Sequence, residues 1–151
     1  QGVPEEQIIG MNYSGTVEVD GIKVTMVPAV HSSGISDGNN IIEGGNPAGY
    51  VIEFENGFKV YHTGDTGLFG DMEWIRKLYA PDLMLVCIGG HFTMGPREAA
   101  EAIKLVAPKY VIPMHYGTFP ILAGTPAELK KHLPAKFKNS VVELNPGETA
   151  N

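Results

Sequence analysis

The chain has 151 residues, of which 43% are hydrophobic, so it can form one domain with an apolar core. Its net charge is -6 and it has no cluster of Lys or Arg, which argues against binding to long nucleic acids or to a membrane surface. The longest apolar stretches have the length of a strand and are too short to cross a bilayer. A single cysteine, Cys87, excludes an internal disulfide and favours a reducing cytoplasm.

The first half of the chain predicts two β-hairpins. Residues 16–20 alternate between apolar and polar, residues 23–30 read as a second strand, and Asp20-Gly21 between them is typical of a tight turn. The second hairpin joins residues 49–55 to residues 58–62. Between the two hairpins, residues 31–47 are rich in Gly, Ser and Asn without periodicity, and we expect a long loop of functional importance.

The second half predicts helices that alternate with apolar strands. One helix is expected to begin after Asp71, and another begins at the capping box that Thr125 opens and ends near His132. Between them, a helix that begins at Pro96 is expected to place Ala99, Ala100, Ile103 and Val106 on one apolar face. The remaining expected elements are strands at 82–88, 110–114 and 141–144. Two hairpins followed by this alternation predict an α/β (α+β) fold, a mixed sheet with helices packed on one face.

Chemistry-bearing side chains follow four of the predicted strands. His31, Asp65, His91 and His115 each lie at or just beyond the carboxyl end of a strand, and small or Gly residues flank them. Ligands of open sheets gather at that edge, and imidazole with carboxylate suits zinc, manganese or iron. One Asp can bridge two cations, because a carboxylate has two oxygens.

Structural roles compete with this interpretation. A single His at a strand end is more often a hydrogen-bonded structural residue than a ligand, and Asp65 could simply form an Asx-turn. His62 lies inside a predicted strand, where it could pack in the core or lie beside a metal site. His132 ends a helix, where a solvated or capping role is expected. Spacing alone therefore leaves a metal site and a purely structural set of residues both open.

Three motifs extend the argument beyond spacing. The sequence resembles the third, fourth and fifth metal motifs of the metallo-β-lactamase superfamily in the segments Pro28-Ala29-Val30-His31-Ser32-Ser33-Gly34, Tyr61-His62-Thr63-Gly64-Asp65-Thr66-Gly67 and Pro113-Met114-His115-Tyr116-Gly117-Thr118. The segments 44–49 and 88–95 are similar to those of a small bacterial and archaeal group of metal-dependent hydrolases within that superfamily. The resemblance covers essentially the whole chain, in the same order.

The resemblance implies half of a four-layer αββα sandwich. It also implies that His31 and His115 are terminal metal ligands and that Asp65 is a bridging carboxylate between two divalent cations, Zn or Mn, with Fe or Ni as alternatives. A metal-bound water would then attack an ester-, amide- or phosphoester-type small-molecule substrate. We expect His91 to lie beside the metals, where it would contact the substrate or the transition state.

The sequence departs from the family at one place. The superfamily's leading motif, His-x-His-x-Asp-His, is expected well before His31, and no His-x-His is present. We therefore interpret 1–151 as the C-terminal half of a metallo-β-lactamase-like domain, with the N-terminal half absent from this chain. The missing half, or another chain such as a second copy, would cover the exposed sheet face. The alternative is a non-catalytic metal-binding or structural half-domain that associates with a partner chain.

Overall fold

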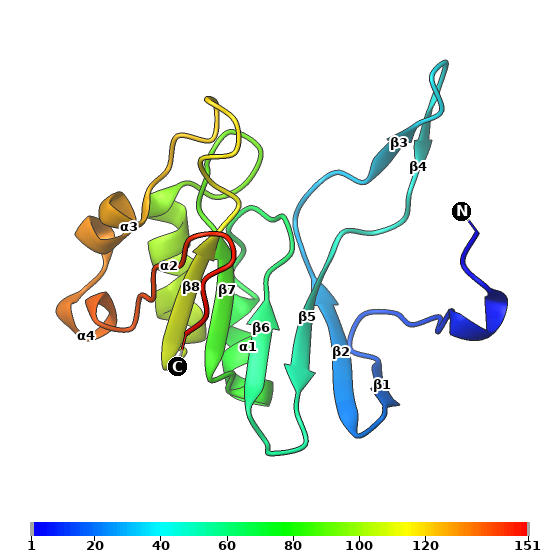
Figure 1. Cartoon of the computed structure of the whole chain (residues 1–151), viewed down its shortest axis with the longest axis horizontal. Coiled ribbons are helices and arrows are strands. Elements are labelled where there is room, and N and C mark those ends of the chain that lie inside the picture. The colour runs from blue at the N-terminus through cyan, green and yellow to red at the C-terminus, as the bar shows by residue number, and fades with distance from the viewer. Residues whose placement is uncertain (1, 151) are drawn as a thin grey trace.

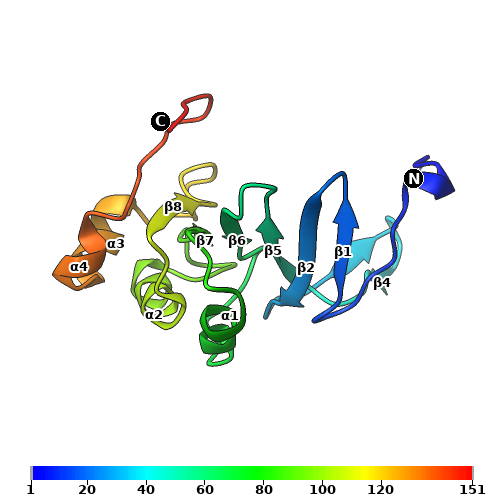
Figure 2. The ribbon, with the colours of Figure 1, turned by 90° about the horizontal axis from the view of Figure 1, so that it is seen from below.

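The computed structural model describes residues 2–150, which form one six-stranded mixed sheet with helices on one face (Figure 1). The strand order is β1-β2-β5-β6-β7-β8, and α1 and α2 lie together on one side of the sheet (Figure 2). The predicted fold class is confirmed.

Within residues 2–150, no helix is long and apolar enough to cross a membrane. The sheet strands are β1 (Thr16–Val19), β2 (Ile22–Pro28), β5 (Ala48–Glu53), β6 (Lys59–His62), β7 (Leu83–Cys87) and β8 (Tyr110–Met114), and the helices are η1 (Glu5–Gln7), α1 (Met72–Tyr79), α2 (Pro96–Val106), α3 (Pro126–His132) and α4 (Ala135–Lys138).

Both predicted hairpins form the antiparallel part of the sheet. β1 pairs with β2, and Asp20 and Gly21 between them have φ of 50° and 82°, the left-handed conformation that a two-residue hairpin turn requires. β5 pairs with β2 on one side and with β6 on the other. The antiparallel pairing therefore continues through four neighbouring strands before the parallel part begins.

The segment expected to be an unstructured loop contains a further hairpin, and that expectation was wrong. β3 (Gly34–Ser36) pairs with β4 (Ile41–Glu43) outside the main sheet, and the hairpin projects away from the body of the molecule (Figure 1). The Asp37 carboxylate accepts hydrogen bonds from the backbone N–H groups of Asn39 and Asn40, and these bonds close the turn. Three-residue strands with every residue exposed show no alternation, so the sequence pattern does not reveal them.

The parallel part of the sheet carries the core. β7 pairs in parallel with β6 and with β8, and α1 and α2 cover the same face. The predicted apolar face of α2 is confirmed, because its buried residues include Ala99, Ala100, Ile103 and Val106. These side chains belong to one cluster with Tyr61, Met84, Val86 and Val111 from the strands.

The C-terminal segment agrees with the prediction only in part. Thr125 caps α3 as expected, since its hydroxyl accepts a 3.2 Å hydrogen bond from the N–H of Glu128. The helix α4 was not predicted. The strand expected at 141–144 was wrong, because only Val141 forms a bridge, to Val111 of β8.

The face of the sheet opposite the helices is apolar and half-exposed. Residues on this face share one row across the strands, in which Met26, Tyr50, His62, Leu85 and Ile112 are in register from β2 to β8. Each of the five is only partly buried, whereas the residues between them along the strands pack under the helices. We call this surface the open face. His62 is the one imidazole in that row.

Candidate metal centre

The directions of the strands bring the predicted site residues to one edge. β6, β7 and β8 are parallel, and β2 runs in their direction because two antiparallel pairings, through β5, separate it from β6. Their carboxyl ends therefore share one edge of the sheet. His31, Asp65, His91 and His115 follow these four strands, so the edge predicted from the sequence is the observed one.

Asp65 and His115 form the closest pair at this edge. His115 Nε2 lies 3.4 Å from Asp65 Oδ2, and both side chains remain partly exposed. This separation exceeds the usual range of an N–H···O hydrogen bond. It equals the distance of about 3.4 Å expected between two ligands of a tetrahedral cation whose bonds are about 2.1 Å long. The donor atoms therefore fit one divalent cation held between them.

Backbone conformation places this pair. Gly64, beside Asp65, has a φ of 64°, and a Cβ at this residue would lie 2.3 Å from the carbonyl oxygen of Ala48. His115 itself adopts a φ of 56°, which is uncommon for a residue with a Cβ. A Cβ on Gly89, at the end of the intervening strand β7, would lie 2.2 Å from the His115 carbonyl oxygen. Glycines thus permit the close approach of three loops, while the conformation of His115 carries strain of a kind common at functional sites.

The rings of His115 and His31 have different hydrogen-bonding states. His115 Nδ1 is buried and has no hydrogen-bond partner among the described residues. His31 Nδ1 lies 2.8 Å from the carbonyl oxygen of Ser32, and because a carbonyl only accepts, Nδ1 must carry the proton. In the neutral ring, the lone pair of His31 is then on Nε2. This orientation by a backbone carbonyl is typical of a metal-ligating histidine.

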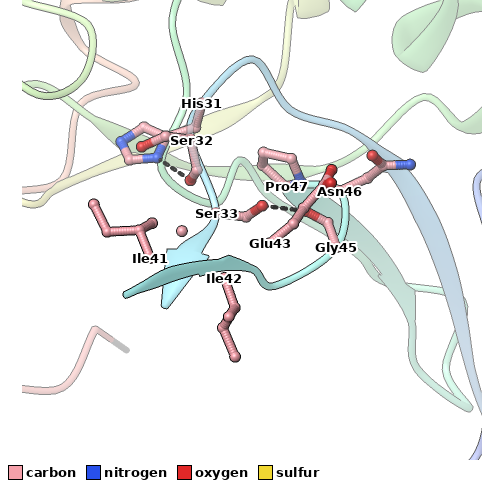
Figure 3. Close-up of a pocket in the computed structure, with 10 residues that line it drawn as sticks. His31, Ser32, Ser33, Ile41, Ile42, Glu43, Gly45, Asn46 and Pro47 are labelled. Atoms are coloured by element: carbon pink, nitrogen blue, oxygen red, sulfur yellow. Dashed lines mark hydrogen bonds between the residues drawn. The ribbon is translucent and has the colours of Figure 1, made fainter. Parts of the chain in front are cut away.

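The structure does not bring His31 together with the other two residues. Among residues 2–150, no three His, Cys, Asp or Glu side chains form a group that could hold a metal ion. His31 instead lines a cleft of about 500 Å³ between its own loop and the β3–β4 hairpin (Figure 3). Of the three ligands that the resemblance implies, only Asp65 and His115 are therefore observed close together, and the role of His31 as a ligand stays a prediction.

His91 is exposed at the same edge. It follows Gly89-Gly90, has a φ of 57°, and its ring forms a T-shaped pair with the Phe92 ring, with 4.4 Å between the centroids. The ring is exposed and is therefore not a core residue packed under α2. Its contact with a metal or a substrate stays a prediction.

The His62 side chain is hydrogen-bonded to the loop that carries Asp65. The backbone N–H of Gly64 donates a 3.0 Å hydrogen bond to His62 Nδ1, so in the neutral ring the proton is on Nε2. The hydroxyl of the adjacent Tyr61 is fully buried and has no hydrogen-bond partner within residues 2–150. Burial, with a smaller effect of Cys87, raises the pKa of Tyr61 above its ordinary value near 10. Neither residue is placed as a metal ligand. His132, at the end of α3, is exposed and remote in the fold, as expected.

Thr66 is the residue at this edge that sequence reasoning missed. It is fully buried, and its hydroxyl and carbonyl groups bind the backbones of neighbouring loops. Its place directly after Asp65 in the fourth motif was the only available signal. A buried threonine in a loop that carries a candidate ligand is informative, because buried hydroxyls in native proteins are hydrogen-bonded.

Comparison with known proteins agrees with this geometry. Residues 1–116 match the model of the beta-lactamase superfamily domain. The chain belongs to this superfamily. A UPF0173 metal-dependent hydrolase from Roseiflexus sp. strain RS-1 is 49% identical over 152 residues, which cover 100% of this chain and 62% of the relative. One from Methanopyrus kandleri is 49% identical over 150 residues, which cover 99% of this chain and 65% of the relative.

A solved structure supports the same superfamily fold. The metallo hydrolase Igni18 from the archaeon Ignicoccus hospitalis superposes with a TM-score of 0.79 and 40% identity, covering 94% of this chain and 59% of the other. The superfamily resemblance and the fold class predicted from the motifs are thereby confirmed. This member of the superfamily spans less than two thirds of the length of the relatives that it matches.

Proposed function

We propose that the protein is a metal-dependent hydrolase whose cations are held at the edge of the sheet by His31, Asp65 and His115. The approach of His115 Nε2 to Asp65 Oδ2, at 3.4 Å, is the observation that carries this proposal. The names of relatives about half identical over the whole chain support it independently. Zn or Mn fits this donor set best, with Fe or Ni as alternatives, and two cations are expected, because each oxygen of Asp65 can serve one of them.

Each side chain has a defined part in this proposal. A divalent cation held there would lower the pKa of a bound water toward about 7 and polarise the bond under attack. Asp65 would hold the cations at a fixed separation, and the imidazoles of His31 and His115 would complete their coordination as neutral ligands. His91, exposed and free to reach solvent at the same edge, would contact the substrate or stabilise developing negative charge.

The cleft beside His31 is the proposed substrate site. Ser32, Ser33 and Asn46 offer neutral polar groups there, and the hairpin contributes Ile41, Ile42 and the carboxylate of Glu43 (Figure 3). Among the described residues, no Lys or Arg lines the cleft. A lining without positive charge suits a small molecule with an ester, amide or phosphoester bond better than a long nucleic acid.

We also propose that residues 1–151 are the C-terminal half of the domain and that an N-terminal half covers the open face. The apolar row of the open face and the partial coverage of the relatives support this. The alternative, a non-catalytic half-domain that associates with a partner chain or a second copy, draws on the same open face. A cytoplasmic location is proposed because Cys87 is a buried free thiol.

The experiment compares metal binding by two variants of this chain. Asp65→Ala should abolish the binding of Zn²⁺ measured by competition with a chromophoric chelator, because it removes a ligand shared by both cations. His132→Ala is the matched control, since it removes an exposed imidazole from α3 and should leave binding unchanged. Equal zinc affinity of the wild type and Asp65→Ala would refute the proposed site. If the chain binds metal but a chain extended to the length of its relatives hydrolyses nothing, the non-catalytic alternative holds.

A further inference from the structure

Thr66 joins the backbone of two loops that carry candidate ligands. Its hydroxyl accepts a 2.9 Å hydrogen bond from the N–H of Val30 and donates a 2.8 Å hydrogen bond to the carbonyl of Gly67. Thr66 directly follows Asp65, and Val30 directly precedes His31. A single side chain therefore links the residues next to two candidate ligands that lie far apart in the sequence.

The link between these loops has two points of attachment. The N–H of Gly67 donates a 2.8 Å hydrogen bond to the carbonyl of Val30. Both backbone polar groups of Val30 are thus bound by the dipeptide Thr66-Gly67. Two hydrogen bonds fix the orientation of Val30 as well as its distance from Thr66-Gly67. This contact therefore sets the direction of the backbone at the next residue, His31.

Thr66 also reaches the loop of His91. Its carbonyl oxygen accepts a 3.0 Å hydrogen bond from the N–H of Met94 and a weaker one from the thiol of Cys87, at 3.5 Å. The carbonyl of Met94 in turn accepts a 3.0 Å hydrogen bond from Gly90, which precedes His91. The side chain of Thr66 is fully buried, so these bonds are shielded from water.

We infer that Thr66 is a positioning residue that sets where His31 lies relative to the pair of Asp65 and His115. This inference rests on the proposed function for the identity of the ligands, but the hydrogen bonds exist independently of any metal. Within Thr66, only the hydroxyl binds the N–H of Val30, because the Thr66 carbonyl binds a different loop. Loss of the hydroxyl should leave Val30 held by the Gly67 hydrogen bond alone, so the loop of His31 should become less fixed while Asp65 and His115 stay together.

The test uses variants that separate the hydroxyl from the volume of the side chain. Thr66→Val keeps the shape and removes the hydroxyl, Thr66→Ala removes both, and Thr66→Ser keeps the hydroxyl. Thr25→Val is the matched control, because Thr25 is also buried, lies in the middle of β2 and, among the described residues, shares a side-chain hydrogen bond with Thr16 of β1 alone. Folding of every variant is checked by circular dichroism.

Two readouts are measured on the whole 151-residue chain. Without metal, hydrogen exchange of the Val30 amide followed by NMR should be at least about tenfold faster in Thr66→Val and Thr66→Ala, because the hydrogen bond that protects it is gone. Zinc affinity from chelator competition should fall by about 10–100-fold in the same two variants, the usual effect of removing a group that orients a metal ligand. Thr66→Ser and Thr25→Val should match the wild type in both.

The outcomes separate this inference from the proposed function. Unchanged Val30 exchange in Thr66→Val, or faster exchange with unchanged zinc affinity, overturns the positioning role. Loss of the fold in both Thr66→Val and Thr66→Ala also overturns it, because Thr66 would then be a core residue. Absence of zinc binding by the wild type refutes the proposed function, while the exchange of Val30 still decides whether Thr66 holds that loop.

Discussion

Gly89→Ala is expected to displace His115 and to weaken metal binding without touching any ligand. A Cβ on Gly89 would lie 2.2 Å from the carbonyl oxygen of His115 and 3.2 Å from Leu122 Cβ. The first contact involves backbone, which cannot rotate away. The two atoms would have to separate by about 1 Å before an ordinary van der Waals contact is reached.

The size of this effect follows from the required displacement. Overpacking of this kind costs about 1–3 kcal/mol of unfolding free energy. For a chain of this length, that corresponds to a decrease in Tm of about 3–10 °C. Displacing a functional group by about 1 Å can cost about 100-fold in function, so we expect zinc affinity to fall by a factor of about 10–100.

The assay combines thermal unfolding by circular dichroism with zinc titration. Gly70→Ala is the matched control, because a Cβ there meets no atom within 4 Å and its φ is not positive. Gly70→Ala should keep both the Tm and the zinc affinity of the wild type. If Gly89→Ala keeps the wild-type Tm and zinc affinity, the backbone around His115 can move without cost. The close contact of Gly89 with His115 would then not position His115.

Three further predictions concern activity and pH. The 151-residue chain alone should show no appreciable metal-dependent hydrolysis. A chain extended to the length of its relatives should hydrolyse its substrate when Mn²⁺ or Zn²⁺ is added. Hydrolysis by the isolated chain, in a preparation free of longer species, would contradict the half-domain proposal. In the extended chain, His91→Gln should lower the turnover rate by about 10²–10³ with metal content intact, and loss of metal would make His91 a ligand instead. A hydrogen bond from the Lys109 ammonium lowers the pKa of Asp82, and a hydrogen bond from the Lys59 backbone lowers it to a smaller extent. The stability that Asp82 contributes is therefore present above its ordinary pKa of 3.8 and is lost as the pH falls through the lowered pKa. Lys109→Met should raise the pKa of Asp82, read by NMR titration, and should move acid unfolding to higher pH; an unshifted titration would refute the assignment.

The elements with regular periodicity could be predicted from the sequence. The hairpin at Asp20-Gly21 and the buried face of α2 depend on local turn chemistry and on a repeating apolar pattern, and both were found where expected. The β3–β4 hairpin has neither signal, because its strands have three exposed residues each. The closing strand was predicted from an apolar run, but only Val141 reaches β8.

In the candidate site too, the features with a local sequence signal could be predicted and those that depend on tertiary contacts could not. The gathering of strand-end residues at one edge was predicted because each of them follows a predicted strand, and the pair of Asp65 and His115 lies at that edge. The hydrogen bonds of Thr66 could not be predicted, because Val30 and Thr66 are 36 positions apart and no local pattern links them. The place of His31 also depends on this tertiary contact, so its motif gave its identity but not its distance from the pair.

The pair of Asp65 and His115 has a consequence for folding. Asp65 follows β6 and His115 follows β8, and β7 lies between these two strands in the sheet. In the folded sheet the two side chains therefore meet across the end of β7, at the separation that the assembled sheet gives them. A cation bound by both should select the assembled sheet over partly folded forms, adding about 2.7 kcal/mol to the free energy of unfolding at a free metal concentration 100 times the Kd. In cells, the supply of metal would then govern how much of the protein survives proteolysis as well as how much of it is active.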